Sequence, residues 1–258
     1  MQLVLSLMPG IDLMGMAFKA EGFSVVQGGD IIFGGDVRTE HYPPGRFDGV
    51  IGGPPCQMFS RLAAMVRANG HEPKFGNLIP EFERCVFESQ PAWFLMEEVP
   101  DAPLPVVDGY AVWSTLLNNR QCYAENGKPA EQNRVLRWSF GVRGNTPRVL
   151  MIETAALANP IFKYAATRAA RDDIPAGGGS KKVGRNPAKD CLSHGTQRSA
   201  KGFATSKRLQ GLPDDFDLPG FTVEAKVKAV ANGVPWPMAR ALARAVLEAT
   251  EAADGREA

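Results

Sequence analysis

A single cysteine stands in a stiff turn directly after a short apolar run. Residues 48–51 read as a buried parallel strand, and Gly52-Gly53-Pro54-Pro55-Cys56 follows them. Ligands of open α/β sheets bind beyond the carboxyl ends of the strands, and each proline restricts the backbone around it. A thiol held in such a loop suits a nucleophile, whereas a structural cysteine more often lies inside an apolar run. Cys56 is therefore the first candidate catalytic residue.

A glutamate, Glu97, ends the apolar run 92–96, which reads as another buried strand. Partial burial raises the pKa of a carboxyl and allows it to donate a proton near neutral pH, although a capping or salt-bridged glutamate would leave the same pattern. Gln132, Arg134 and Arg137 flank the start of a further predicted strand. An arginine there could stabilise a carboxylate or a thiolate, or clamp a phosphate.

The turn after the first predicted strand, residues 6–12, lies where a nucleoside-type cofactor would bind. Asp30 and Asp36 follow the second predicted strand and could accept hydrogen bonds from ribose hydroxyls or an adenine amino group. The glycine pattern GxGxxG, which cradles a pyrophosphate, is absent from the sequence. S-adenosylmethionine fits this combination, and a plain strand–helix turn with two surface aspartates is the alternative.

The elements that position these residues alternate between strand and helix in the first half of the chain, which predicts a doubly wound α/β sheet. Predicted strands span residues 3–7, 23–27, 48–51, 92–96, 121–125 and 135–140, and predicted helices span residues 13–21, 78–89, 110–117, 222–231 and 235–253. Glycine-rich, basic sequence replaces this rhythm after about residue 144. The sequence therefore predicts three regions, 1–143, a small and largely irregular insert at 144–203, and a C-terminal segment at 204–258.

The net charge of +1 over 258 residues hides a basic block. Residues 161–210 contain eleven Lys and Arg against three Asp, a local charge of +8 that leaves −7 for the remainder. Such a block suits a polyanion such as nucleic acid, and a solvated loop is equally consistent with it.

Cysteine and histidine usage argues against metal chemistry. The four cysteines and three histidines lack the spacing of a disulfide framework or a metal site, which predicts reduced thiols in a cytoplasm and no metal. No apolar run approaches the length that spans a bilayer, and the apolar N-terminus reads as a strand and not as a signal peptide.

Five segments, taken in order, make the chain resemble the DNA cytosine-C5 methyltransferases, and most closely the short forms of bacteriophages and prophages. They are Pro55-Cys56-Gln57, Glu97-Glu98-Val99, Gln132-Asn133-Arg134, residues 208–213, and Asn232-Gly233-Val234. The chain also departs from the family pattern. Glu98 replaces an asparagine, Leu136 a second arginine (unless Arg137 substitutes) and Ala231 a glycine, while Met8 and Ile31 stand where aromatic residues often stack on adenine.

The resemblance implies a Rossmann-like, S-adenosylmethionine-dependent sheet whose insert, 144–203, recognises the target. It implies a monomeric DNA (cytosine-5-)-methyltransferase acting on duplex DNA in a bacterial cell or phage-infected host, in a restriction–modification setting. In the implied mechanism Cys56 adds to C6 of a flipped cytosine, Glu97 holds N3, Arg134 orients Glu97 or the base, and the loop 58–76 closes over it.

The same resemblance assigns the site residues in three groups. The catalytic residues would be Cys56, Glu97, Gln132 and Arg134. The cofactor-binding residues would be Met8, Pro9, Gly10, Ile11, Asp30, Asp36, Val37, Pro55, Leu78, Asn232 and Val234. The DNA-binding residues would be Gln57, Ser60, Lys181, Lys182, Arg185 and Arg208.

Two alternatives stay open at this point, an RNA (tRNA) cytosine-C5 methyltransferase and a catalytically degenerate DNA-binding decoy. An NAD-dependent oxidoreductase on the same type of sheet is disfavoured, because the glycine pattern that binds a pyrophosphate is missing and a fold alone does not establish a function.

Overall fold

The computed structural model describes residues 1–55, 59, 76–155 and 200–254. They fall into two compact units. The first, here called the sheet unit, contains the described residues of Met1–Leu117, Val135–Ile152 and the chain from Leu242 onward. The second, here called the helical unit, contains Asn118–Arg134 and the described residues between Glu153 and Ala241.

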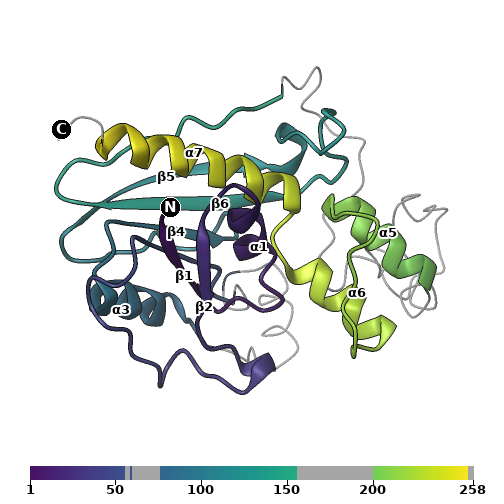
Figure 1. Ribbon diagram of the computed structural model, residues 1–258, viewed down its shortest axis with the longest axis horizontal. Coiled ribbons are helices and arrows are strands. Elements are labelled where there is room, and N and C mark those ends of the chain that lie inside the picture. The colour runs from purple at the N-terminus through teal and green to yellow at the C-terminus, as the bar shows by residue number, and fades with distance from the viewer. Residues whose placement is uncertain (56–58, 60–75, 156–199, 255–258) are drawn as a thin grey trace. The chain divides into compact units, whose positions relative to one another are not determined.

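One six-stranded sheet organises the sheet unit, with the strand order β2-β1-β3-β4-β6-β5 (Figure 1). The strands are β1 (Leu3–Leu7), β2 (Ser24–Gln27), β3 (Gly49–Gly52), β4 (Trp93–Glu98), β5 (Tyr110–Asn118) and β6 (Val135–Arg143). Strands β1 to β4 pair in parallel and β6 pairs antiparallel with β4. The chain runs from β1 to β2 on one side and returns to β3 on the other, which makes the space between β1 and β3 a topological switch point.

Helices cover both faces of this sheet, as the sequence predicts for a doubly wound fold. Trp93 and Phe94 are consecutive on β4, so their side chains point to opposite faces. Helix α1 (Leu13–Ala20) packs Phe18 against Trp93, with ring centroids 6.3 Å apart. Helix α3 (Ile79–Ser89) packs Phe82 against Phe94, with centroids 5.8 Å apart.

The C-terminal half of α7 (Trp236–Asp254) also belongs to the sheet unit. Arg244 forms an ion pair with Glu21 at the end of α1, with Nη1 and Oε1 3.1 Å apart. Gln2 donates a hydrogen bond of 2.6 Å to the hydroxyl of Thr250. These contacts attach the last helix beside the start of β1.

The helical unit contains η3 (Asn119–Gln121), α5 (Ala200–Gln210), α6 (Val223–Asn232) and the first turns of α7. The predicted start of α6 is confirmed, because the Thr222 hydroxyl accepts a hydrogen bond from the backbone N–H of Ala225. Thr222 therefore satisfies one of the four N–H groups that a helix start leaves unpaired.

The sheet unit also contains a short helix, η1 (Ile31–Phe33), in the connection between β2 and β3.

Two predicted elements are wrong. Residues 110–117 form strand β5 and not a helix, since a short apolar run rich in aromatic and β-branched residues has no period that separates the two states. Residues 121–125, predicted as a strand, begin at the last residue of η3 and continue into a turn. There Asn118 and Gln121 form a capping box, and these local hydrogen bonds compete with strand pairing.

Candidate active site

The carboxyl ends of β1, β3 and β4 lie side by side at the switch point. Leu7 is in register with Gly52, and Gly52 is in register with Met96. The residues that follow, 8–12 after β1 and 53–55 after β3, therefore emerge at the same edge as Glu97 near the end of β4. This is the edge at which open α/β sheets bind their ligands.

The carboxylate of Glu97 lies directly against Gly53. A Cβ atom built on Gly53 would be 2.8 Å from Glu97 Oε2, which is closer than real Cβ contacts come. Only glycine therefore leaves room for the carboxylate in this position. Gly53 precedes Cys56 by three residues, so the predicted acid contacts the turn that carries the predicted nucleophile.

Cys56 itself lies outside the described residues, as do Gln57, Ser60, Lys181, Lys182 and Arg185, and most of the predicted closing loop 58–76. Pro55 ends the described part of the turn. Two other cysteines are described, Cys85 and Cys122; both are buried, and neither forms a disulfide with a described residue. Burial raises the pKa of the Cys85 thiol to about 11, which disfavours the thiolate that nucleophilic attack requires.

Glu98, next to Glu97 on β4, is only 1% exposed. Its Oε2 accepts a hydrogen bond of 2.8 Å from the backbone N–H of Val99, and its Oε1 is buried with no hydrogen-bond partner among the described residues. Burial raises the pKa of Glu98 to about 8, the Val99 bond opposes this rise, and the charge of Glu97 adds to it. Glu98 therefore retains its proton at pH 7.

The turn after β1 has an unusual backbone. Met8, Gly10 and Asp12 have φ values of 51°, 57° and 56°. These lie in the left-handed region, which residues other than glycine rarely adopt. Asp12 stabilises this turn: it is 1% exposed and accepts hydrogen bonds from Ser6, Gly15 and Gln27. In the sequence, the only indication that Asp12 stabilises the turn is its position immediately before a helix.

Asp30 joins the two segments predicted to bind the cofactor. One carboxylate oxygen accepts from the backbone N–H of Gly10 at 2.9 Å, and the other accepts from the N–H of Ile32 at 2.9 Å. Each oxygen has a second lone pair that can accept from a ligand. Met8, Gly10, Ile11 and Asp30 therefore lie together beyond β1.

Asp36 and Val37 follow η1 and differ in their surroundings. Arg38 binds Asp36 through Nε and Nη2, and these hydrogen bonds lower the pKa of the Asp36 carboxyl to about 2. The side chain of Val37 is 3% exposed and packs into the core, as does the partly buried Leu78, which precedes α3.

Glu40 is a residue of this region that the sequence analysis missed. Its Oε2 accepts hydrogen bonds from the backbone N–H of Gly29, at 2.6 Å, and from the hydroxyl of Tyr42. A Cβ atom on Gly29 would be 1.8 Å from Glu40 Oε1, so the glycine is needed for this approach. Gly29 immediately precedes Asp30, and the Gly28-Gly29 pair is the only sequence signal for this contact.

In the helical unit, Arg134 fastens the turn that contains Asn232 and Val234. It is 9% exposed, and its Nη1 donates to the carbonyl oxygens of Ala231, at 3.1 Å, and Gly233, at 2.7 Å. The Gln210 amide also donates to the Gly233 oxygen. Hydrogen bonds thus connect Gln132-Asn133-Arg134 with Asn232-Gly233-Val234, which were predicted as two separate motifs.

The other predicted residues of the second half have distinct environments. Gln132 is fully buried, and neither of its amide atoms has a hydrogen-bond partner among the described residues. Arg208 forms an ion pair with Glu131. Arg137, in the sheet unit, donates to the carbonyl oxygen of Pro100 and so supports the chain just beyond Glu98.

Neither a metal cluster nor a membrane-spanning helix is found in the described residues. No group of three or more His, Cys, Asp or Glu among them could hold a metal ion. The helices in the same parts of the chain are all too short or too polar to cross a bilayer.

Comparisons with known proteins indicate what the sequence and the fold of this chain resemble. The sequence model of the C-5 cytosine-specific DNA methylase family matches residues 6–103. The Type II methyltransferase M1.HphI of Haemophilus parahaemolyticus is 41% identical over 64 residues, which are 25% of this chain and 17% of that protein. The chain thus spans about a sixth of the length of this curated relative.

Solved structures match almost the entire chain. A protein described as a DNA modification methyltransferase encoded within an E. coli prophage superposes with a TM-score of 0.61 at 14% identity, covering 97% of this chain and all of that one. The Entamoeba histolytica methyltransferase EhMeth superposes with a TM-score of 0.60 at 10% identity, covering 96% and 98%. These two likenesses establish a methyltransferase fold, and the sequence model shows that residues 6–103 are similar to the C-5 cytosine-specific DNA methylase family.

Proposed function

We propose that the protein is a DNA cytosine-C5 methyltransferase that uses S-adenosylmethionine and forms a covalent adduct through Cys56. The contact of the Glu97 carboxylate with Gly53 carries this proposal, because it sets an acid against the turn that bears the cysteine. Addition of a thiolate to C6 of cytosine requires this pair of groups, a nucleophile and a proton donor at N3.

The proposed reaction assigns one task to each side chain. The Cys56 thiolate forms a bond to C6 and drives the electrons of the C5–C6 double bond toward C5, while Glu97 donates a proton to N3. The nucleophilic C5 then accepts a methyl group, which bound S-adenosylmethionine supplies as an electrophile. Loss of the C5 proton to a base restores the double bond and breaks the bond to Cys56. Because C5 and C6 are stacked within a duplex, the cytosine must first flip out.

The turn beyond β1 suits a cofactor that carries no phosphate. The backbone N–H of Gly10, which could otherwise meet a phosphate, is bound by the Asp30 carboxylate. A phosphate would also be repelled by that carboxylate, whereas the sulfonium of S-adenosylmethionine is positive and ribose hydroxyls can donate to the free lone pairs of Asp30. Ile31, which is 52% exposed, offers apolar surface beside Asp30.

The partner in this proposal is duplex DNA, and the protein acts as a monomer in the cytoplasm. The charge of +8 over residues 161–210 supports a polyanionic substrate, since phosphate neutralisation dominates the affinity of proteins for nucleic acids. That segment would track the backbone and recognise bases, and a reducing compartment would keep the Cys56 thiol available.

Transfer of labelled methyl groups from S-adenosylmethionine to duplex DNA tests the proposal, followed by bisulfite sequencing of the product. Protected cytosines in one sequence context are expected with the wild-type protein and with Cys191→Ser, a cysteine outside the five family motifs. Cys56→Ser should transfer no methyl groups and should form no adduct with DNA that contains 5-fluorocytosine. Adduct formation by Cys56→Ser would refute the assignment, and transfer to tRNA alone would favour the RNA enzyme.

A further inference from the structure

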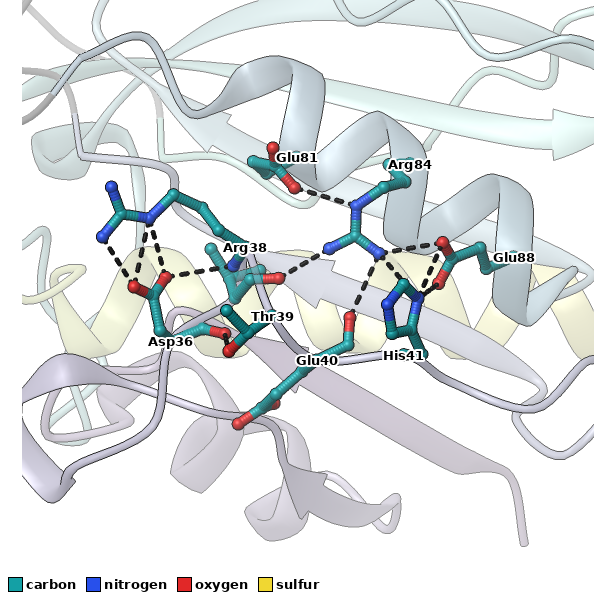
Figure 2. A network of polar contacts seen from close by, with 9 residues as sticks. Asp36, Arg38, Thr39, Glu40, His41, Glu81, Arg84 and Glu88 are labelled. Carbon is teal, nitrogen blue, oxygen red and sulfur yellow. Dashed lines mark hydrogen bonds and ion pairs between the residues drawn. The ribbon is translucent and has the colours of Figure 1, made fainter.

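An arginine on α3 holds the segment that carries Asp36. The guanidinium of Arg84 donates from Nη2 to the carbonyl oxygen of Val37 at 2.6 Å, and from Nη1 to the carbonyl oxygen of Glu40 at 3.1 Å (Figure 2). The segment 36–41 belongs to no strand or helix, so these oxygens have no ladder to join. Arg84 supplies the hydrogen bonds that regular structure would otherwise provide.

Arg84 is itself fixed from its own helix. Its Nε donates to Glu81 at 2.8 Å and its Nη1 donates to Glu88 at 2.9 Å, from the positions three residues before and four residues after it. Figure 2 shows the guanidinium between these two carboxylates and the 36–41 segment, with the His41 ring next to both Arg84 and Glu88. A planar guanidinium with five N–H groups can serve four acceptors at once, whereas a lysine ammonium cannot match that geometry.

The contacts continue from Arg84 to both acidic residues of the proposed cofactor site. Val37, whose oxygen Arg84 binds, directly follows Asp36. Glu40, whose oxygen Arg84 also binds, holds the backbone N–H of Gly29 through its carboxylate, and Gly29 directly precedes Asp30. Displacement of the 36–41 segment would therefore move the two carboxylates relative to each other.

We propose that Arg84 is a positioning residue for S-adenosylmethionine, which holds the 36–41 segment on α3 so that Asp36 and Asp30 meet the nucleoside together. This inference rests on the proposed function, since it assumes that the cofactor binds at this edge of the sheet. Arg84 contacts no reacting group, and its effect is confined to the affinity for the cofactor.

The test measures S-adenosylmethionine binding by calorimetry for the wild-type protein, Arg84→Gln, Arg84→Lys and the control Arg46→Gln. Arg46 is an exposed arginine in the same connection between η1 and β3. Loss of two charge-assisted hydrogen bonds should raise the Kd for the cofactor about 10- to 100-fold in both Arg84 variants. Arg46→Gln should bind like the wild type. At saturating cofactor, the kcat and the KM for DNA of both Arg84 variants should remain within about twofold of wild type.

A second measurement separates positioning from loss of the fold. Exchange of the C5 hydrogen of cytosine with solvent, in DNA and without cofactor, requires only reversible addition of Cys56 to C6, and it should be retained in Arg84→Lys. Equal cofactor affinity in wild type and both Arg84 variants would overturn the inference and leave the proposed function intact. A parallel loss of cofactor binding and of C5 hydrogen exchange would reduce Arg84 to a structural role. Failure of the wild-type protein to bind S-adenosylmethionine would overturn both proposals.

Discussion

Replacing Glu98 with glutamine should make the protein more stable, and increasingly so as the pH rises. The side chain is 1% exposed, accepts one hydrogen bond from the Val99 N–H, and its other oxygen has no partner in the described part of the chain. A buried carboxylate without a cation is costly, so the native protein retains the proton and the pKa rises from 4.5 to about 8. Glutamine has nearly the same shape and carries no charge at any of these pH values.

The direction of this pH dependence follows from the number of protons that the native and the unfolded states bind. Between pH 4.5 and about 8 the native state retains the Glu98 proton while the unfolded state has lost it, so this group lowers the free energy of unfolding as the pH rises. One pKa unit corresponds to about 1.4 kcal/mol. At pH 7 the free energy of unfolding is therefore about 3 kcal/mol lower than it would be below pH 4.5. Above pH 8 this loss reaches its limit of about 5 kcal/mol. Glu98→Gln removes this loss.

Urea denaturation of wild type and Glu98→Gln at pH 5, 6, 7 and 8 measures the effect. The difference in unfolding free energy between the two proteins is the quantity to follow, because contributions of other titrating groups cancel in it. Glu248→Gln, at an exposed position of α7, is the control and should give a difference that is independent of pH. A flat difference for Glu98→Gln would refute the reasoning. So would a difference that favours wild type as the pH rises, since Glu98 would then be a stabilised carboxylate.

Three further changes test other parts of the molecule. Gly53→Ala puts a Cβ 2.8 Å from the Glu97 carboxylate and should lower the single-turnover rate constant about 100-fold with cofactor affinity unchanged; an unchanged rate constant would contradict this. Arg134→Ala removes a buried, charged donor from the carbonyl oxygens of Ala231 and Gly233 and should lower the free energy of unfolding by about 2–4 kcal/mol in urea titrations; a change below 0.5 kcal/mol would contradict this. Neutralising three basic residues should weaken DNA binding and reduce its dependence on salt, and an unchanged salt slope would mean a solvated loop. These residues are Lys181, Lys182 and Arg185.

Much of the sheet could be predicted because its strands are short, apolar and bounded by glycine, proline or charged residues. The strands before the Cys56 turn and before Glu97 were both recognised in this way, and the structure confirms them as β3 and β4. The prediction failed at residues 110–117, whose apolar run is compatible with either a buried helix or a strand. There the pairing of β5 beside β6 decides the outcome, and pairing is a property of the folded sheet.

The chemical groups of the candidate site can be recognised from local sequence, because a side chain carries the same thiol, carboxyl or guanidinium wherever it lies in the fold. The contacts that adjust those groups join residues far apart in the chain. Glu97 contacts Gly53, 44 positions earlier, and Arg84 binds the carbonyl oxygen of Val37, 47 positions earlier. No periodicity or propensity encodes such distances.

Burial is likewise decided by the tertiary structure. Glu97 and Glu98 are neighbours of the same type, yet alternation along β4 and packing around its end leave Glu98 almost fully buried and Glu97 only partly so. The sequence could indicate that a carboxyl stands at this strand end. Whether Glu98 keeps its proton depends on how much water its carboxyl loses, and that is determined only when the surrounding chain has packed against it.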